Sequence, residues 1–212
     1  MGSFVIAFCR RRPLASVLLI CALAWLPGFF TLPPLDRDES RFAQATKQML
    51  ESRDFIDIKL GQEARYAKPV GIYWLQAAST AVLGNGDRAQ IWTYRVPSFL
   101  GALAAVAATF WMVRAFAAAD TAFFATLILG LSVLLMTEAK IAKTDAVLLA
   151  TVTLAQAVLL RVYAFGGSRE AAASPHPDFA KGEMPASPPG GGRFDSAPED
   201  KNRLSSGGVL WD

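Results

Sequence analysis

Four ionisable residues stand where the chain passes between apolar and polar sequence, and their types suit a general base and a phosphate ligand. Asp38 and Glu39 follow a long apolar run, Lys68 precedes Pro69, and Asp145 begins another apolar run. A fixed carboxylate can act as a general base toward a hydroxyl group, and a lysine ammonium is a common ligand of phosphate. We therefore predict that these residues form a reaction site at a membrane surface.

Each of these residues also has a structural interpretation. Asp38 and Glu39 can satisfy the free N–H groups at the start of a helix, and position alone favours that role. Asp145 can likewise cap the helix that it begins, and Lys68 can simply extend its ammonium to the membrane surface. Ionisable groups at a membrane boundary are nevertheless functional candidates by default, so both interpretations stay open at this point.

Four apolar runs decide the class of protein. Hydrophobic residues make up 53% of the 212 residues and charged residues 18%, below the roughly 25% of an average soluble domain. The first three runs lack a charged residue over 17 to 19 positions, close to the roughly 20 residues that cross the hydrocarbon. The fold class expected is all-α, a polytopic membrane helical bundle with about four transmembrane helices: Leu14–Leu32, Val96–Val113, Thr121–Thr137 and Ala146–Leu160.

Flanking charge predicts the orientation of these spans. The basic residues Arg10, Arg11 and Arg12 favour a cytoplasmic N-terminus, and the first span is an uncleaved signal anchor because no clear cleavage site ends it. Alternation then places residues 33–95 and 138–145 on the periplasmic face and the C-terminal tail in the cytoplasm. The many basic residues of the first outer loop oppose this rule, which weakens for loops of about 60 residues.

Within the first outer loop, helical periodicity predicts two helices that lie along the membrane interface. One runs from Asp38, as its cap, to about Glu51, with apolar residues on one face. The other, Val70–Leu83, begins after Pro69 and is too short to span a bilayer. Between them, the alternation of residues 55–60 predicts a short extended segment.

The charge and the cysteine content of the chain limit the classes of partner that it can bind. The formal net charge is +3, and the basic residues lie beside apolar runs, so we expect membrane lipids as partners and no nucleic acid. The only two cysteines, Cys9 and Cys21, have neither disulfide nor zinc spacing, and His176 is assigned no role.

The C-terminal part differs in character from the rest. From Gly166 to Gly208 the sequence is rich in Gly, Pro and Ser, a composition typical of disorder. We therefore divide the chain into a membrane part, residues 1–165, and a disordered tail or linker, residues 166–212. Because an apolar stretch begins at Val209, the chain is expected to be a fragment of a longer protein.

Two segments of the first loop resemble a known enzyme family. DRDESRFAQATKQMLESRDF contains Asp-Glu-Ser-Arg-Phe, and ARYAKPVGIYWLQAAS contains Tyr-Ala-Lys-Pro. Their spacing, with a later Thr-Asp-Ala at the start of a span, is similar to the N-terminal region of glycosyltransferase family 39. This family includes protein mannosyltransferases and aminoarabinose–lipid A transferases with the C-type membrane glycosyltransferase fold. The resemblance covers about residues 5–165.

The resemblance implies a glycosyltransferase of the bacterial inner membrane. It would take a sugar from a polyprenyl-phosphate donor and pass it to a lipid or protein acceptor on the outer side, as in lipid A modification or protein glycosylation. Asp38 matches the family's catalytic aspartate of the first loop, Lys68 the lysine near the lipid phosphate, and Asp145 the acidic residue of the second outer loop. Family members have many more spans, so the resemblance leaves open whether this chain is active alone, and Arg53-Asp54 stands where the family usually has Gly-Asp.

The chemistry of such a transfer gives roles to further residues. A polyprenyl phosphate leaves as an anion, so it needs cationic stabilisation more than it needs an acid. Lys68 and Arg41 can supply that charge, as can Lys140 or Lys143 in the second outer loop, unless Lys140 merely neutralises the nearby Glu138. Asp38 would accept the proton of the acceptor hydroxyl.

No cofactor is required by the sequence, but a divalent cation fits the chemistry. Asp38, Glu39 and Asp145 could share one through hard oxygen ligands, and Glu39 is also a candidate for contact with the acceptor. The alternative function is a non-catalytic membrane protein, such as a transporter fragment or an assembly subunit. A transporter should carry polar residues near the middle of its spans, and these spans hold little beyond Thr, Ser and Gln156.

Overall fold

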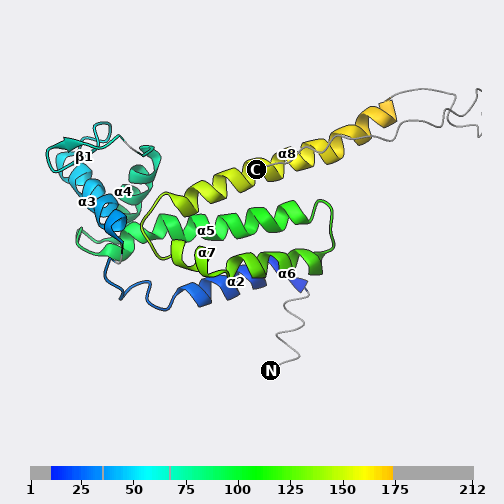
Figure 1. The fold of residues 1–212 in the computed structure, drawn as a ribbon, viewed down its shortest axis with the longest axis horizontal. Helices are drawn as coiled ribbons and strands as arrows, with labels where there is room; N and C mark the ends of the chain where they lie inside the picture. Colours follow the sequence, from blue (N-terminus) through cyan, green and yellow to red (C-terminus); the bar gives the residue numbers. More distant parts are fainter. Residues whose placement is uncertain (1–10, 35, 67, 174–212) are drawn as a thin grey trace, which may run out of the picture. The chain divides into compact units, whose positions relative to one another are not determined.

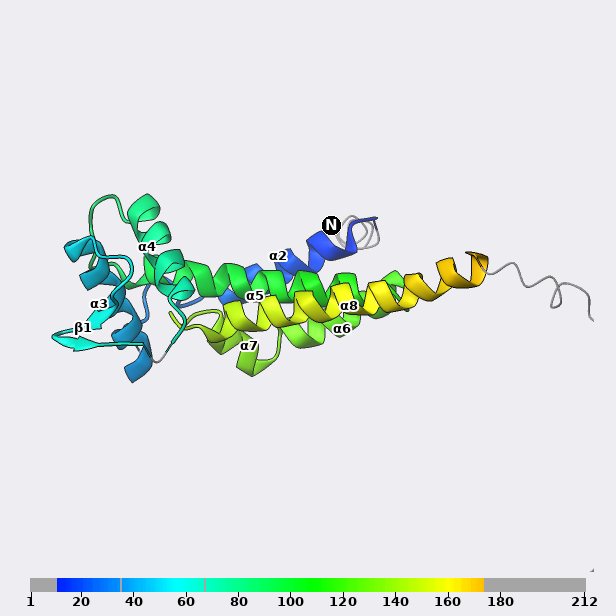
Figure 2. The same cartoon turned by 90° about the horizontal axis from the view of Figure 1, so that it is seen from above.

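The computed structural model describes residues 11–34, 36–66 and 68–173, and these residues are mainly helical (Figure 1). One group of helices forms an elongated bundle, and two further helices with a small hairpin form a cap at one end of it (Figures 1 and 2). In chain order the elements are α2 (Pro13–Trp25), α3 (Arg37–Ser52), β1 (Lys59–Leu60), β2 (Glu63–Ala64), α4 (Gly71–Leu83), α5 (Ile91–Val113), α6 (Ala119–Gly130), α7 (Val133–Glu138) and α8 (Asp145–Ala173).

Helices α5 and α8 form the centre of the bundle and run in the same direction. Near their first turns, the side chain of Ser98 on α5 bonds to the backbone of Lys143, just before α8. Toward the other end, Arg161 of α8 lies over the ring of Trp111 and donates to its carbonyl. Both helices therefore begin at the end of the bundle that carries the cap.

A glycine allows α5 and α8 to touch. A Cβ added at Gly101 would lie 2.9 Å from both the Cα and the N of Val147, a separation that real side chains do not tolerate. Only a residue without a side chain permits this approach, and small residues at helix interfaces are the usual means of close packing in membranes.

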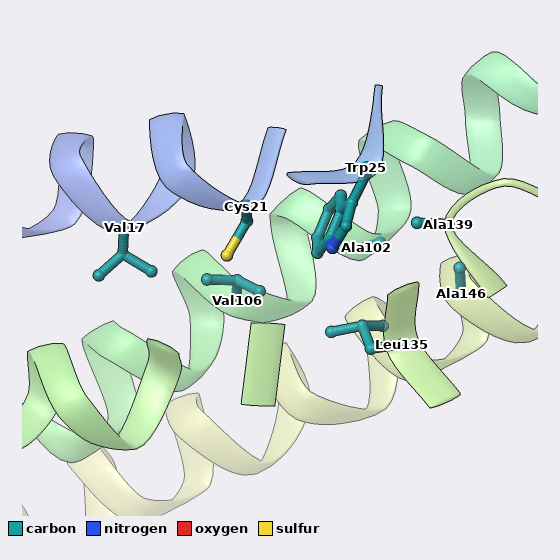
Figure 3. Packing of buried hydrophobic residues seen from close by; sticks show 8 residues of the cluster. All are labelled: Val17, Cys21, Trp25, Ala102, Val106, Leu135, Ala139 and Ala146. Carbon is teal, nitrogen blue, oxygen red and sulfur yellow. The ribbon is translucent and has the colours of Figure 1, made fainter. Parts of the chain in front are cut away.

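Helix α2 packs on α5 and α6 through a compact apolar cluster (Figure 3). Trp25 is fully buried, and its indole N–H donates to the carbonyl of Gly130 at 3.0 Å. The sulfur of Cys21 also lies against Gly130, so α2 and α6 meet at another glycine. The cluster also contains Val106 of α5 and Leu135 of α7.

Two of the four predicted spans are single helices long and apolar enough to cross a membrane: α5 and the Asp145–Ala164 part of α8. The predicted first span is helical only to Trp25, after which Pro27 and Gly28, with φ +80°, turn the chain. The predicted third span is divided, because α6 ends at Gly130 and Ser132 caps the separate helix α7. The expectation of continuous helices over these two runs was therefore wrong.

The cap is built from α3 and α4, as the periodicity predicts. Phe42 of α3 and Tyr73 of α4 stack with ring centroids 5.4 Å apart, and the Thr46 hydroxyl donates to the side-chain oxygen of Gln76 at 2.8 Å. These contacts bury the apolar face of α3 against α4, while its polar face stays exposed.

A proline in α5 leaves a backbone carbonyl to which a side chain of the cap can bond. Pro97 lies inside α5 and has no N–H, so it cannot donate to the carbonyl of Thr93 four residues earlier. The Ser79 hydroxyl of α4 donates to that carbonyl instead, at 2.7 Å. The hydroxyls of Thr80 and Thr93 bond to each other at 3.0 Å, so α4 is joined to α5 by side chains that complete its backbone bonding.

The start of α3 differs from the prediction in one important respect. The cap is Asp36 and not Asp38: its side chain accepts the N–H of Asp38, and the helix begins at Arg37. Asp38 is therefore in the first turn of α3, and its carboxylate does not cap the helix. An aspartate two residues earlier competes successfully because its extended backbone suits the cap position.

The segment between the two cap helices is less extended than predicted. Asp54 accepts the N–H groups of Ile56 and Asp57, which bends the chain there. Among the described residues of this segment, only β1 and β2 are strands, paired antiparallel with Lys59 opposite Ala64. The all-α expectation therefore misses a small hairpin, which the amide of Gln48 holds on α3 by bonding both to the N–H and to the carbonyl of Gly61.

At its far end α8 continues to Ala173, past the boundary expected at residue 165. The rest of the predicted tail, from residue 174, lies outside the described residues.

Candidate active site

Two loops that are distant in sequence meet at the end of the bundle that carries the cap, and the buried carboxylate of Glu39 contacts residues of both. Glu39 of α3 is fully buried, and its Oε1 lies 2.7 Å from Nε of Arg95 on α5. Its Oε2 accepts from the Arg95 Nη2 at 3.3 Å. Oε1 also accepts the backbone N–H of Ala142 in the second loop, at 3.1 Å. One carboxylate thus connects α3, α5 and the residues before α8.

The guanidinium of Arg95 has further backbone partners. It donates to the carbonyls of Phe29 and Leu32 at 3.0 and 2.9 Å and to that of Pro33 at 3.2 Å. These three carbonyls follow the end of α2, so they do not accept hydrogen bonds within that helix. The buried charge is therefore compensated by a carboxylate and by the chain that leaves the first apolar run, as burial of a guanidinium requires.

A second contact between the loops is ionic and partly exposed. The ammonium of Lys143 lies 2.5 Å from Oδ2 of Asp36, while Oδ1 of Asp36 accepts the N–H of Asp38 at 3.1 Å. The hydrogen bond from Lys143, followed by the one from Asp38, lowers the pKa of Asp36 below its usual value. The bond to Asp36 raises the pKa of Lys143. Both groups are therefore charged across the neutral range.

Glu138, at the end of α7, faces Lys143 from another direction. Its Oε1 is 3.9 Å from the Lys143 ammonium, and its Oε2 is buried with no hydrogen-bond partner among the described residues. Burial raises the pKa of Glu138, and the nearby Lys143 charge only partly opposes that effect. The sequence left open a pairing of Glu138 with Lys140; the structure pairs Glu138 with Lys143 instead.

Asp145 and Glu138 line one cavity. This cavity has a volume of about 440 Å³ and lies among α6, α7 and the start of α8, with walls that are otherwise mostly apolar. Asp145 is the first residue of α8 and is exposed. Two carboxylates of different exposure therefore line a mostly apolar cavity beside the second loop.

Asp38 and Arg41 form a one-turn pair on the exposed side of α3. Nη1 of Arg41 lies 3.7 Å from Oδ1 of Asp38, and the Asp38 side chain is 54% exposed. Because Asp36 performs the capping, Asp38 keeps a carboxylate that can approach another molecule. An exposed cation one turn away can hold an anion beside it.

The Lys68 segment also reaches the start of α8. Pro69 and Gly71 line a groove of about 410 Å³ together with Thr144 and Val147. Lys68 itself is exposed and makes no ion pair with the residues that the structure describes. Lys68 does not line this groove, but it directly precedes Pro69, which does.

The structure thus brings together three predicted segments: the start of α3 with Asp38, Arg41 and Glu39; the Lys68–Pro69 segment; and residues 140–145. Lys143 and Glu39 are already engaged in contacts between the loops. Lys140, which is half-buried, is in no ion pair within the described part of the chain.

Sequence reasoning missed three residues that organise this region: Asp36, Arg95 and Glu138. A signal for Arg95 existed, because a cation one residue before an apolar span is costly unless it is paired. Asp36 was indistinguishable from its neighbour Asp38, since both can cap a helix. Glu138 gave no signal, because its partner depends on how the second loop folds.

Metal binding has limited support in the arrangement of side chains. Over the described ranges, no group of three or more His, Cys, Asp or Glu side chains is placed to hold a metal ion. Of the three carboxylates predicted to share a divalent cation, Glu39 is bonded to Arg95 and Ala142.

Comparison with known proteins supports the interpretation of this region. The profile of the dolichyl-phosphate-mannose-protein mannosyltransferase family matches residues 27–175, which include every predicted site residue. No curated protein and no solved structure matches the chain significantly. The match extends over more than half of the 212 residues and contains both loops that meet at the site. The chain therefore belongs to the dolichyl-phosphate-mannose-protein mannosyltransferase family, a family of membrane glycosyltransferases that use lipid-linked sugar donors.

Proposed function

We propose that this protein transfers a sugar from a polyprenyl-phosphate donor to a hydroxyl of a lipid or protein acceptor at the outer face of a bacterial inner membrane. Membership of the family supports the reaction class and the lipid-linked donor. The meeting of the two loops at one end of an apolar bundle supports a single site for donor and acceptor.

In this proposal the carboxylates and the cations have separate tasks. Asp38 accepts the proton of the acceptor hydroxyl as that oxygen attacks the anomeric carbon. The bond between this carbon and the donor phosphate oxygen breaks, and the polyprenyl phosphate leaves as an anion. Lys68 and Arg41 stabilise that anion, together with Lys140. The exposure of Asp38 and Lys68 supports these roles, because both side chains are accessible.

The second loop has a supporting role in the same site. Asp145 stands at the start of α8 beside the 440 Å³ cavity, where a carboxylate can orient the sugar or the acceptor. Lys143 is a weaker candidate for phosphate than Lys140, because Asp36 already neutralises its ammonium.

Four crossings of the membrane complete the proposal. Helices α5 and α8 are long enough to cross singly, and α2 and the α6–α7 pair pack beside them. Because α5 and α8 run in the same direction, a connection between them must return across the bilayer. The proposed orientation has residues 33–95 and 138–145 in the periplasm and both termini in the cytoplasm.

The observation that carries the proposal is the contact between residues 36–39 and 142–143, which joins the two loops that hold the candidate residues. The test is transfer of radiolabelled sugar from a polyprenyl-phosphate donor by membranes that contain the protein. Asp38→Asn and Lys68→Ala are each expected to reduce transfer by a factor of about 10² or more, since each removes a charge that acts in the transition state.

Matched controls come from the exposed hairpin. Asp57→Asn and Lys59→Gln remove the same kinds of charge from an ion pair outside the site, and both should retain transfer. Full transfer by Asp38→Asn at normal protein levels would refute the catalytic assignment. Transfer abolished by EDTA and restored by Mg²⁺ would add a divalent cation to the mechanism.

A further inference from the structure

One carboxylate between the two loops has a separate partner on each of its oxygens. Oδ1 of Asp36 accepts the backbone N–H of Asp38 at 3.1 Å, and Oδ2 binds the ammonium of Lys143 at 2.5 Å. Asp38 carries the proposed base, and Lys143 lies two residues before Asp145. The same side chain therefore contacts the chain at the proposed base, Asp38, and two residues before Asp145.

The lysine on the other side of this contact is itself held in place. The carbonyl of Lys143 accepts the Ser98 hydroxyl at 3.0 Å, and its N–H donates to the Ser98 oxygen at 3.3 Å. Ser98 belongs to α5, so the backbone of Lys143 is fixed on the central helix. The side chain of Lys143, 18% exposed, extends from that fixed point to Asp36.

We propose that Asp36 is a positioning residue, which sets the first turn of α3 and therefore Asp38 at a defined place relative to the start of α8 and Asp145. This inference rests on the proposed function, because it concerns the geometry of that reaction. Asp36 touches neither substrate nor reacting atoms in this role: it acts through the N–H of Asp38 and the ammonium of Lys143.

The contact should affect geometry more than stability. Asp36 is 35% exposed, and partly exposed ion pairs contribute little to the free energy of unfolding. The buried carboxylate of Glu39, which bonds to Arg95 and to the N–H of Ala142, already holds the loops together. A shift of about 1 Å in a reacting group, however, can reduce a rate by a factor of about 10², so loss of the ionic contact should lower kcat in a protein that remains folded.

The roles of the two carboxylate oxygens of Asp36 can be separated by mutation. Asp36→Asn keeps an oxygen for the Asp38 N–H and removes the charge that binds Lys143, whereas Asp36→Ala removes both. We expect Asp36→Asn to lower kcat about tenfold with less than a twofold change in donor KM, and Asp36→Ala to lower kcat further. Lys143→Met should give the same loss as Asp36→Asn, and the double variant Asp36→Asn/Lys143→Met should lose no more than either single variant.

A different role of Lys143 would produce a different pattern. If Lys143 binds the donor phosphate, Lys143→Met raises donor KM more than Asp36→Asn does, and the two effects add; that result overturns the inference. Asp54→Asn is the matched control, because Asp54 also accepts backbone N–H groups, those of Ile56 and Asp57, in an exposed turn outside the site. It should keep kcat and KM.

Hydrogen–deuterium exchange of the protein in nanodiscs supplies a measurement that does not depend on transfer. Asp36→Asn should raise exchange about tenfold both in residues 37–41 and in residues 140–145, whereas Asp54→Asn should raise it in neither. Exchange that rises only in the first segment would show a simple helix cap and overturn the inference. Absence of transfer by the wild-type protein refutes the proposed function and the positioning role with it. Wild-type transfer with unchanged kcat in Asp36→Asn refutes the positioning role alone.

Discussion

Arg95 and Glu39 lie 2.7 Å apart although 56 residues separate them in the chain, and neither side chain is more than 1% exposed. Their contact fixes α3 on α5 and, through the N–H of Ala142, fixes the second loop on both. The family motif Asp-Glu-Ser-Arg-Phe therefore contains two neighbouring carboxylates with different environments: Glu39 is enclosed and structural, and Asp38 is exposed and available.

Removal of Arg95 should be severe. Arg95→Met removes the guanidinium that bonds to the buried carboxylate of Glu39 and to three backbone carbonyls, so we expect a loss of about 3–5 kcal/mol in the free energy of unfolding. Thermal unfolding in detergent measures it. Arg88→Met is the control, because Arg88 is exposed and should change stability by less than about 0.5 kcal/mol. Equal unfolding temperatures for the two variants would contradict the role of the buried pair.

The contact between α5 and α8 should be sensitive to one methyl group. Gly101→Ala places a Cβ 2.9 Å from the backbone of Val147, so the helices must separate, at a cost of about 1–3 kcal/mol. Gly71→Ala provides the comparison, since a Cβ at that position meets nothing within 4 Å. Differential scanning fluorimetry should show a lower unfolding temperature for Gly101→Ala only.

The backbone of Arg53 has a conformation that is strained for arginine, and substitution by glycine should relieve the strain. It ends α3 with φ 58° and ψ 20°, a left-handed conformation that glycine adopts without steric cost. Arg53→Gly should therefore stabilise the protein by about 0.5–1 kcal/mol. Arg37→Gly, in the first turn of the same helix, should have the opposite sign because glycine is a poor helix former. Loss of stability in Arg53→Gly would mean that the arginine side chain has a role of its own.

Glu138 should make stability depend on pH. Burial raises the pKa of Glu138 above its ordinary value of 4.5, while the nearby charges of Lys143, Asp145 and Asp36 modify the effect. The folded protein then binds more protons than the unfolded chain between the two pKa values, so stability falls as pH rises through that window. Glu138→Gln should remove this slope, which unfolding temperatures measured from about pH 4 to about pH 8 would reveal. A slope unchanged in the variant would assign it to another group.

Lys140 is the better candidate for a phosphate ligand in the second loop. It is outside every ion pair formed by the described residues, whereas Lys143 is held by Asp36. Lys140→Gln should raise donor KM by roughly tenfold, as expected for loss of one charge-assisted contact. Lys47→Gln, on the other side of α3, should leave KM unchanged. A normal KM in Lys140→Gln would exclude this lysine from the donor site.

The helices were predictable wherever apolar spacing was the only determinant. The predicted segments 38–51 and 70–83 correspond to α3 and α4, because one face of each is apolar and buried against the other. The breaks in the helices of the first and third apolar runs were not predictable from hydrophobicity. Hydrophobicity contains no information on the turn after Trp25 or the helix cap at Ser132.

Composition identified the segments of the candidate site, but not their bonding. A sequence shows that Asp36, Asp38 and Glu39 are acidic, but it does not show which of them meets a cation. That choice depends on partners about 60 to 110 residues later, Arg95, Ala142 and Lys143, whose positions are set only when α5 and α8 pack. The Ser79 bond to the carbonyl left by Pro97 is equally invisible before packing.

The sequence order of the Arg95 partners has a consequence for biosynthesis. The carbonyls of residues 29, 32 and 33 and the carboxylate of Glu39 all precede Arg95 in the chain, so the ribosome releases them first. When α5 is synthesised, the guanidinium of Arg95 can bind these carbonyls and the Glu39 carboxylate, which are already present. It need not enter the membrane boundary as an unpaired cation. We therefore expect membrane insertion of α5 to depend on the earlier placement of the residues that follow α2.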